Sequence, residues 1–144
     1  MLLYKKNPET LIRKGGTMEA RNTQSIEDYL ECILMLGEKN EHVRSIDVSQ
    51  ELGVTKPSVS VAMKKLRERG MITVDLNGHI FLTDEGLAIA EKVYSKHKLL
   101  TNLLLHIGVD KETAADEACL IEHAISDSTY ERLNELYIQM QKKK

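Results

Sequence analysis

The segment that most restricts the fold is SIDVSQELGVTKPSVSVAMKKLRERG, residues 45–70. Its first apolar residues recur at helical spacing up to Gly53, which predicts a short helix that ends at this glycine. Thr55 follows as the N-cap of a second helix, with Pro57 in the first turn and Gly70 just beyond the end. A short helix and a longer one, joined by so tight a glycine-containing turn, form a helix-turn-helix.

A β-hairpin is expected directly after these two helices. In MITVDLNGHIFLT, residues 71–83, β-forming residues lie on both sides of Asn77-Gly78. Asn-Gly is the strongest two-residue hairpin signal, because both central residues of the turn must tolerate a positive φ. A hairpin in this place is the wing of a winged helix-turn-helix domain, which we assign to residues 23–83.

The rest of the chain has a helical pattern or no pattern. Ser25 is the expected N-cap of a first helix, and Thr83 the N-cap of a long fourth one. Residues 1–22 lack amphipathic spacing, which predicts a flexible arm. Outside the helix-turn-helix, the expected helices cover residues 25–37, 84–107, 111–125 and 128 onward. The predicted fold is therefore mainly α, with an N-terminal winged helix-turn-helix and small β-hairpin wing before a second, α-helical domain at 84–144.

The composition limits where the protein acts. Charged residues make up 29% of the chain, and no apolar run approaches the ~18 residues of a membrane span. The N-terminal residues do not resemble a secretion signal, so we expect a cytoplasmic protein with no membrane partner. Cys32 and Cys119 are the two cysteines. In a cytosolic chain they are expected to pack or to bind metal, because disulfides are rare there.

A local basic patch lies on the second helix of the helix-turn-helix. The net charge of −2 gives no bulk affinity for nucleic acid, yet residues 54–69 carry five cations and one acid. Such a helix suits the major groove, where its N-terminal residues contact base edges and its cations reach phosphates. Pro57 and Val61 can contact thymine methyl groups. The expected DNA contacts are Thr55, Lys56, Pro57, Ser58, Ser60, Lys64 and Lys65, with His79 at the wing tip.

The alternative is a purely structural role, in which the hydroxyl groups only cap the helix and the cations form a solvated face. The combination of a tight turn, a capped basic helix and an Asn-Gly wing favours DNA binding over this alternative.

A second group of functional residues lies in CLIEHAIS, residues 119–126. Cys119, Glu122 and His123 fall on one face of the expected helix, where a thiolate, a carboxylate and an imidazole converge. Three ligands from one helix leave coordination positions of a divalent transition metal unfilled.

Other helices offer the missing ligands. Asp28 and Glu31 lie one turn apart on the first helix, and His97 lies on the long helix. Each of these residues also has a plain structural interpretation: Asp28 can complete a capping box with Ser25, His97 can be a partly buried helix histidine, and Cys119 can be a small core residue.

The strings SIEDYLECI, VTKPSVS, YSKHKLL and DEACLIEHAIS closely resemble the diphtheria toxin repressor family of iron- and manganese-responsive transcriptional repressors. The resemblance covers residues 23–138. It implies that Asp28, Cys119, Glu122 and His123 form one metal site, and that Glu31 and His97 join Glu122 in a second.

The chain departs from both branches of that family. Iron-type members usually carry methionine at the position of Asp28, and manganese-type members usually carry glutamate at the position of Cys119. Thr101 and Ala115 replace two ligands of the iron-type ancillary site. Hard carboxylates suit Mn²⁺ or Fe²⁺, whereas a thiolate favours softer ions. We therefore expect Mn²⁺ or Fe²⁺ in the cell, with Zn²⁺, Co²⁺ or Cd²⁺ binding in vitro.

The resemblance implies a metal-activated repressor that binds operator DNA as a homodimer and controls metal-ion homeostasis genes. Residues 107–135 carry eight acids and two cations, so a bound cation would offset their repulsion and fix two recognition helices ~34–36 Å apart. Apolar residues at 99–109 and on the last helix are the expected dimer surface. The alternative is a winged-helix regulator that responds to a non-metal ligand. We expect no enzyme and no organic substrate, because the sequence contains no substrate-binding loop and no nucleophile with an orienting partner.

Overall fold

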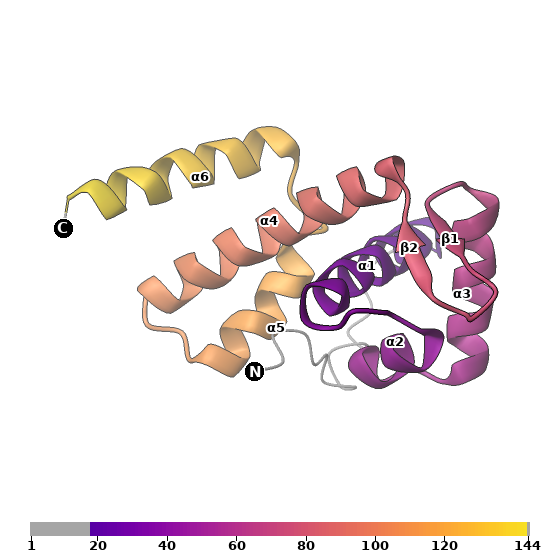
Figure 1. Ribbon diagram of the computed structural model, residues 1–144. Helices are drawn as coiled ribbons and strands as arrows, with labels where there is room; N and C mark the ends of the chain where they lie inside the picture. The colour runs from indigo at the N-terminus through magenta and orange to yellow at the C-terminus, as the bar shows by residue number, and fades with distance from the viewer. Residues whose placement is uncertain (1–17, 144) are drawn as a thin grey trace. The chain divides into compact units, whose positions relative to one another are not determined.

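The computed structural model describes the backbone of residues 18–143 and the side chains of residues 26–143 (Figure 1). Its mainly helical architecture, with one small antiparallel hairpin, confirms the predicted fold class. None of the described helices is long and apolar enough to cross a membrane. The elements in chain order are α1 (Met18–Lys39), α2 (Ser45–Leu52), α3 (Lys56–Glu68), β1 (Ile72–Val74), β2 (Ile80–Leu82), α4 (Asp84–His106), α5 (Lys111–Ile121) and α6 (Asp127–Lys142).

The chain divides into two compact units, one up to Lys92 and one from Val93. The division falls inside α4, so the first turns of this helix belong with the wing and the remaining turns with α5 and α6.

The turn between α2 and α3 has the conformation that the sequence predicts. Gly53 adopts the left-handed conformation with φ of 67°, and its N–H donates to the carbonyl of Ser49. Thr55 caps α3, because its side-chain oxygen accepts a hydrogen bond from the N–H of Ser58. On the inner faces of the two helices, Val48 and Val59 are fully buried. Packing of these valines in the core leaves the opposite face of α3 exposed to solvent.

The wing is a three-residue pair with Ile72 opposite Leu82 and Val74 opposite Ile80. Its turn is longer than the two-residue Asn-Gly turn expected from the sequence. Among the described residues only glycines have a positive φ, so Asn77 does not adopt the type I′ conformation. The carboxylate of Asp75 instead accepts hydrogen bonds from the N–H groups of Asn77 and His79. This side chain stabilises a wider loop, in which only Gly78 has a positive φ.

Helix α1 begins earlier than expected. The sequence predicts an arm over residues 1–22 and an N-cap at Ser25, but α1 starts at Met18 and Ser25 lies inside it. The segment MEARNTQ contains no proline or glycine and several strong helix formers, so nothing in it stops the helix from extending. Residues 1–17 of the predicted arm lie outside the described residues.

Helix α5 ends earlier than expected. The sequence predicts a helix to about residue 125, but α5 stops at Ile121 and the chain turns before α6. Ser126 caps α6, because its side chain accepts a hydrogen bond from the N–H of Thr129. An N-cap residue has an extended backbone, so a cap at Ser126 requires the preceding helix to have ended. Glu122 and His123 therefore lie in a turn rather than on one regular helical face.

A close backbone contact joins α4 to the start of the wing. At Gly86, a Cβ atom would collide with the backbone carbonyl of Met71. The same carbonyl accepts a hydrogen bond from the N–H of Thr83, and the Thr83 hydroxyl donates to the carbonyl of Gly70. This junction connects the wing to α4, and it leaves no space for a larger residue at position 86.

Substituting Gly86→Ala is expected to lower the free energy of unfolding by about 1–3 kcal/mol, because the added methyl group forces backbone apart. Gly37→Ala is the matched control. Gly37 is helical and exposed with open space at its Cβ position, so alanine there should raise stability by up to about 1 kcal/mol. Urea unfolding followed by circular dichroism measures both changes. Equal urea midpoints for the two variants would contradict the close contact between Gly86 and the Met71 carbonyl.

Candidate functional site

A cluster of metal-ligating side chains lies in the second unit, between α4 and α5. His97 projects from α4, Cys119 from α5, and Glu122 is the C-cap residue of α5. One potential ligand atom from each lies within 4.8 Å of the other two. His97 and Glu122 are each 1% exposed and Cys119 is 4% exposed. The structure thus brings together three of the six predicted ligands from two elements of a single unit.

Glu122 is the centre of this cluster. One carboxylate oxygen, Oε2, lies 2.9 Å from His97 Nδ1, and the other, Oε1, lies 3.4 Å from His123 Nε2. The side chain of His123 is only 4% exposed. A fourth predicted ligand therefore contacts the same carboxylate from the turn that follows α5.

The donor set of this cluster suits a divalent transition metal. Buried ionisable groups are costly unless they are paired or coordinate a metal. Imidazole, thiolate and carboxylate together are typical ligands of first-row transition ions, and imidazole ligands are commonly held by a carboxylate. Four such side chains are buried within one small unit. Their chemistry suits a metal site better than it suits an apolar core.

The other two predicted ligands lie on α1, in the first unit. Asp28 and Glu31 are one helical turn apart, and both side chains are buried, with Glu31 at 0% exposed. Both positions suit carboxylate ligands that point to the same side of α1. Their membership of a metal site remains a prediction.

The two positions where iron-type repressors usually carry additional ligands have other roles here. Thr101 is buried, and its hydroxyl donates a 2.7 Å hydrogen bond to the backbone carbonyl of His97. Ala115 lies on α5 and offers no ligand atom. Thr101 thus bonds to the backbone of the ligand-bearing turn of α4.

Acidic residues crowd the first turns of α5. Partial burial, together with the charges of Glu112 and Asp110, raises the pKa of Asp116. The N–H of Thr113 holds the pKa of Asp110 below its ordinary value, because Asp110 caps the helix. Burial is the larger cause of the raised pKa at Asp116, and the nearby carboxylates of Glu112 and Asp110 add to it.

The predicted DNA-contacting residues of α3 are all exposed. Thr55 and Ser58 bond to each other through their hydroxyl groups at 2.8 Å, as expected for a helix cap. The exposed set is Thr55, Lys56, Pro57, Ser58, Ser60, Lys64 and Lys65. Within the first unit, α3 therefore presents hydroxyl groups at its N-terminal end and cations farther along, as a DNA-reading helix does.

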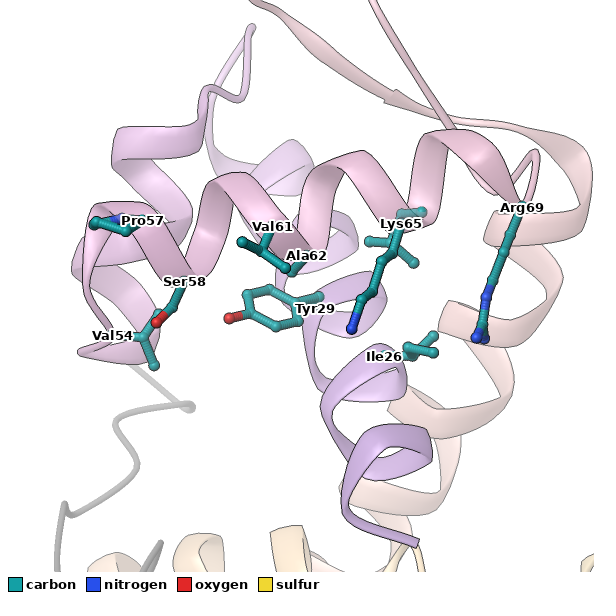
Figure 2. Close-up of a pocket in the computed structure, with 10 residues that line it drawn as sticks. Ile26, Tyr29, Val54, Pro57, Ser58, Val61, Ala62, Lys65 and Arg69 are labelled. Carbon is teal, nitrogen blue, oxygen red and sulfur yellow. The ribbon is translucent and has the colours of Figure 1, made fainter. Parts of the chain in front are cut away.

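A hollow of about 560 Å³ lies between α1 and α3. Figure 2 shows Lys65 and Arg69 extending from α3 toward the helix that carries Ile26 and Tyr29. Val61, beside the hollow, is 57% exposed. An apolar floor with cations alongside leaves this face suited to thymine methyl groups and phosphates.

His79 is more enclosed than a residue at a wing tip. Its ring stacks on that of His42 with centroids 4.0 Å apart, and its nitrogens lie near Arg44 and Asp75 at 3.1 and 3.2 Å. The backbone N–H of His79 also holds the pKa of Asp75 below its ordinary value. Leu76 is the fully exposed residue of the loop. This cluster is not predicted from the sequence, where the one signal for it is Asp75 two residues before Asn77.

Two family models match the chain. One, described as the N-terminal DNA binding domain of iron dependent repressors, matches residues 22–80. The other, described as their metal binding and dimerisation domain, matches residues 83–143. The two matches meet near the end of the wing.

Similar proteins are transcriptional regulators. An uncharacterised HTH-type regulator of Methanocaldococcus jannaschii is 38% identical over 113 residues, which are 77% of this chain and 90% of that protein. The regulator MntR of Escherichia coli O157:H7 is 34% identical over 111 residues, 77% of this chain and 72% of MntR. The solved structure of MtsR, a metal-dependent transcriptional regulator, has a TM-score of 0.72 at 33% identity, covering 78% of this chain. The match covers 53% of MtsR, so this chain spans about half of its length.

Proposed function

Since the chain belongs to the iron dependent repressor family of metal-dependent transcriptional repressors, we propose that it binds operator DNA as a homodimer, and so represses transcription, when Mn²⁺ or Fe²⁺ is bound. The observation that carries this proposal is the buried cluster of His97, Cys119 and Glu122. The relatives are regulators rather than enzymes, and we assign no catalytic activity to the chain. A DNA partner implies action in the cytoplasm, and the expected targets are genes of metal-ion homeostasis.

We assign the metal ligands to two sites. Asp28, Cys119, Glu122 and His123 form one, and Glu31 and His97 join Glu122 in the other. The burial of both α1 carboxylates supports this assignment, because a buried carboxylate is normally paired or bound to metal. Glu122 would bridge the two sites, consistent with its contact to one imidazole through each oxygen.

The choice of metal rests on the mixed ligand set. Three carboxylates and two imidazoles favour Mn²⁺ or Fe²⁺, while the Cys119 thiolate adds affinity for softer ions. Similar repressors have been solved with manganese, at 29% identity and a TM-score of 0.70, and with Zn²⁺, at 35% identity and 0.64. We therefore propose Mn²⁺ or Fe²⁺ as the activating ion, with Zn²⁺, Co²⁺ and Cd²⁺ as competent substitutes in vitro.

The proposed mechanism is electrostatic. Without metal, the α1 carboxylates and the acids of the motif helix α5 would repel one another. A divalent cation would reverse that repulsion, with Asp28 and Glu31 holding it together with the ligands on α4 and α5. This restraint would set the spacing of two recognition helices in a dimer to about one turn of DNA, ~34–36 Å. The metal is then an allosteric ligand, which favours the DNA-competent arrangement by its differential affinity.

Metal should strengthen DNA binding by about 5- to 150-fold, the usual range of allosteric coupling. Fluorescence anisotropy with an operator duplex selected from a random library, in Mn²⁺, Fe²⁺, Zn²⁺, Co²⁺ or chelator, measures this factor. Glu122→Ala should abolish the response, and Cys119→Ala should reduce it most for soft ions. Glu117→Ala removes an exposed acid from the same helix and serves as control. Equal affinity in metal and in chelator would refute the proposal.

Lys65→Ala should weaken DNA binding to all sequences alike, because a phosphate contact carries no base information. The slope of log affinity against log salt should fall in magnitude by about 1. Lys111→Ala, an exposed lysine at the start of α5, controls for the loss of one positive charge. If the slope of log affinity against log salt changes equally in both variants, the proposal that α3 contacts DNA is wrong.

We assign the dimer surface to α6. No residue of α6 is buried, although Leu136 and Ile138 are large apolar side chains, 49% and 45% exposed. A small monomer rarely leaves such a helix uncovered, since contiguous apolar patches mark interaction surfaces. The proposed partner that covers α6 is a second copy of the chain.

Sedimentation velocity at micromolar concentration with Mn²⁺ should therefore report a dimer. Leu136→Glu should shift it to monomer by placing a charge in an apolar interface. Gln139→Glu adds the same charge at an exposed polar position of α6 and should leave the dimer intact. A monomeric native chain would overturn the assignment.

A further inference from the structure

Lys96 is a buried cation directly beside the metal-ligand cluster. It precedes His97 on α4 and is only 9% exposed. Its Nζ lies 3.2 Å from Asp127 Oδ1 and 3.4 Å from the backbone carbonyl oxygen of Ile125. Both partners belong to the second unit, at the junction between α5 and α6. A lysine is rarely buried unless its charge is paired, so these two contacts are the evident reason for its position.

The junction that Lys96 holds also carries two of the candidate ligands. After α5 ends at Ile121, Glu122 and His123 lie in a turn that runs to the N-cap Ser126. The described backbone bonds of this turn include Glu122 N–H to the Ala118 carbonyl and Ala124 N–H to the Ile121 carbonyl. The bonds at the start of the turn tie it to α5, whereas Lys96 ties its far end to α4.

We propose that Lys96 is a positioning residue of the metal centre: its bonds to the Ile125 carbonyl and to Asp127 hold the α5–α6 turn so that Glu122 contacts His97 and His123 lies against Glu122. This inference rests on the proposed function, because it assumes that these side chains bind metal. Lys96 and His97 are consecutive, so one turn of α4 supplies both a ligand and the restraint on the ligands opposite. The same contact fixes the start of α6, because Asp127 is its first residue.

Lys98 provides a matched comparison on the same helix. It lies two residues farther along, is exposed, and places its Nζ 4.4 Å from the centroid of the Tyr94 ring. It has the same charge and length as Lys96 but no contact in the structure with the α5–α6 turn among the described interactions.

Co²⁺ titration of the full chain tests the proposal. A cobalt ion bound by a thiolate gives near-ultraviolet charge-transfer absorption, and its visible bands report coordination geometry. Lys96→Met keeps the apolar stem and removes the charge, and should weaken Co²⁺ affinity by about 10- to 100-fold, the usual cost of losing a residue that orients metal ligands. The visible bands should also change. Lys96→Arg should restore most of the affinity, and Lys98→Met should match the native chain.

The outcomes separate this inference from the proposed function. If the native chain binds no Co²⁺, Zn²⁺ or Mn²⁺, the proposed metal site fails and Lys96 has nothing to position. If the native chain binds and Lys96→Met has the same affinity and spectrum, the inference alone is overturned. Should Lys96→Met fail to fold, Asp127→Asn replaces it, because that carboxylate is more than half exposed. A smaller loss of affinity is expected there, and an unchanged affinity would overturn the inference.

Discussion

The contact between His97 Nδ1 and Glu122 Oε2 is the interaction on which the second unit depends. It joins α4 to the end of α5 in a place where both side chains are almost fully buried. Burying these groups is unfavourable unless each keeps a partner, so the contact fixes the relative position of the two helices as much as apolar packing does. Stability alone does not require this polar centre, since an apolar pair can hold two helices equally well. The proposed role of both side chains as metal ligands would account for it.

The helix-turn-helix was predictable because its signals are local. A left-handed residue at Gly53 and a cap at Thr55 depend on a few neighbouring residues, whatever the rest of the chain does. Candidate ligands could also be named from the sequence, because their chemistry and spacing lie in short strings, and their binding of metal stays a prediction. What the strings did not contain was the conformation around them.

The errors arose where two local signals competed or where none was present. At the end of α5, helical spacing continues to Ile125, but the cap at Ser126 ended the helix four residues earlier. In the wing, Asp75 bonded to the loop backbone and replaced the expected two-residue turn. The contacts of Lys96 could not be predicted from the sequence, since its partners are 29 and 31 residues away and only the fold brings them together.

The early end of α5 affects how the proposed metal centre would act. Ligands on a regular helix are held by its own hydrogen bonds, but Glu122 and His123 lie in a turn whose shape depends on α4 and α6. Any ion that binds them therefore also restrains the start of α6, the helix to which we assign dimer formation. Linkage is reciprocal, so an operator that selects one dimer arrangement must raise metal affinity by the same factor by which metal raises affinity for the operator. In this mechanism the α5–α6 turn is the element through which both ligands act.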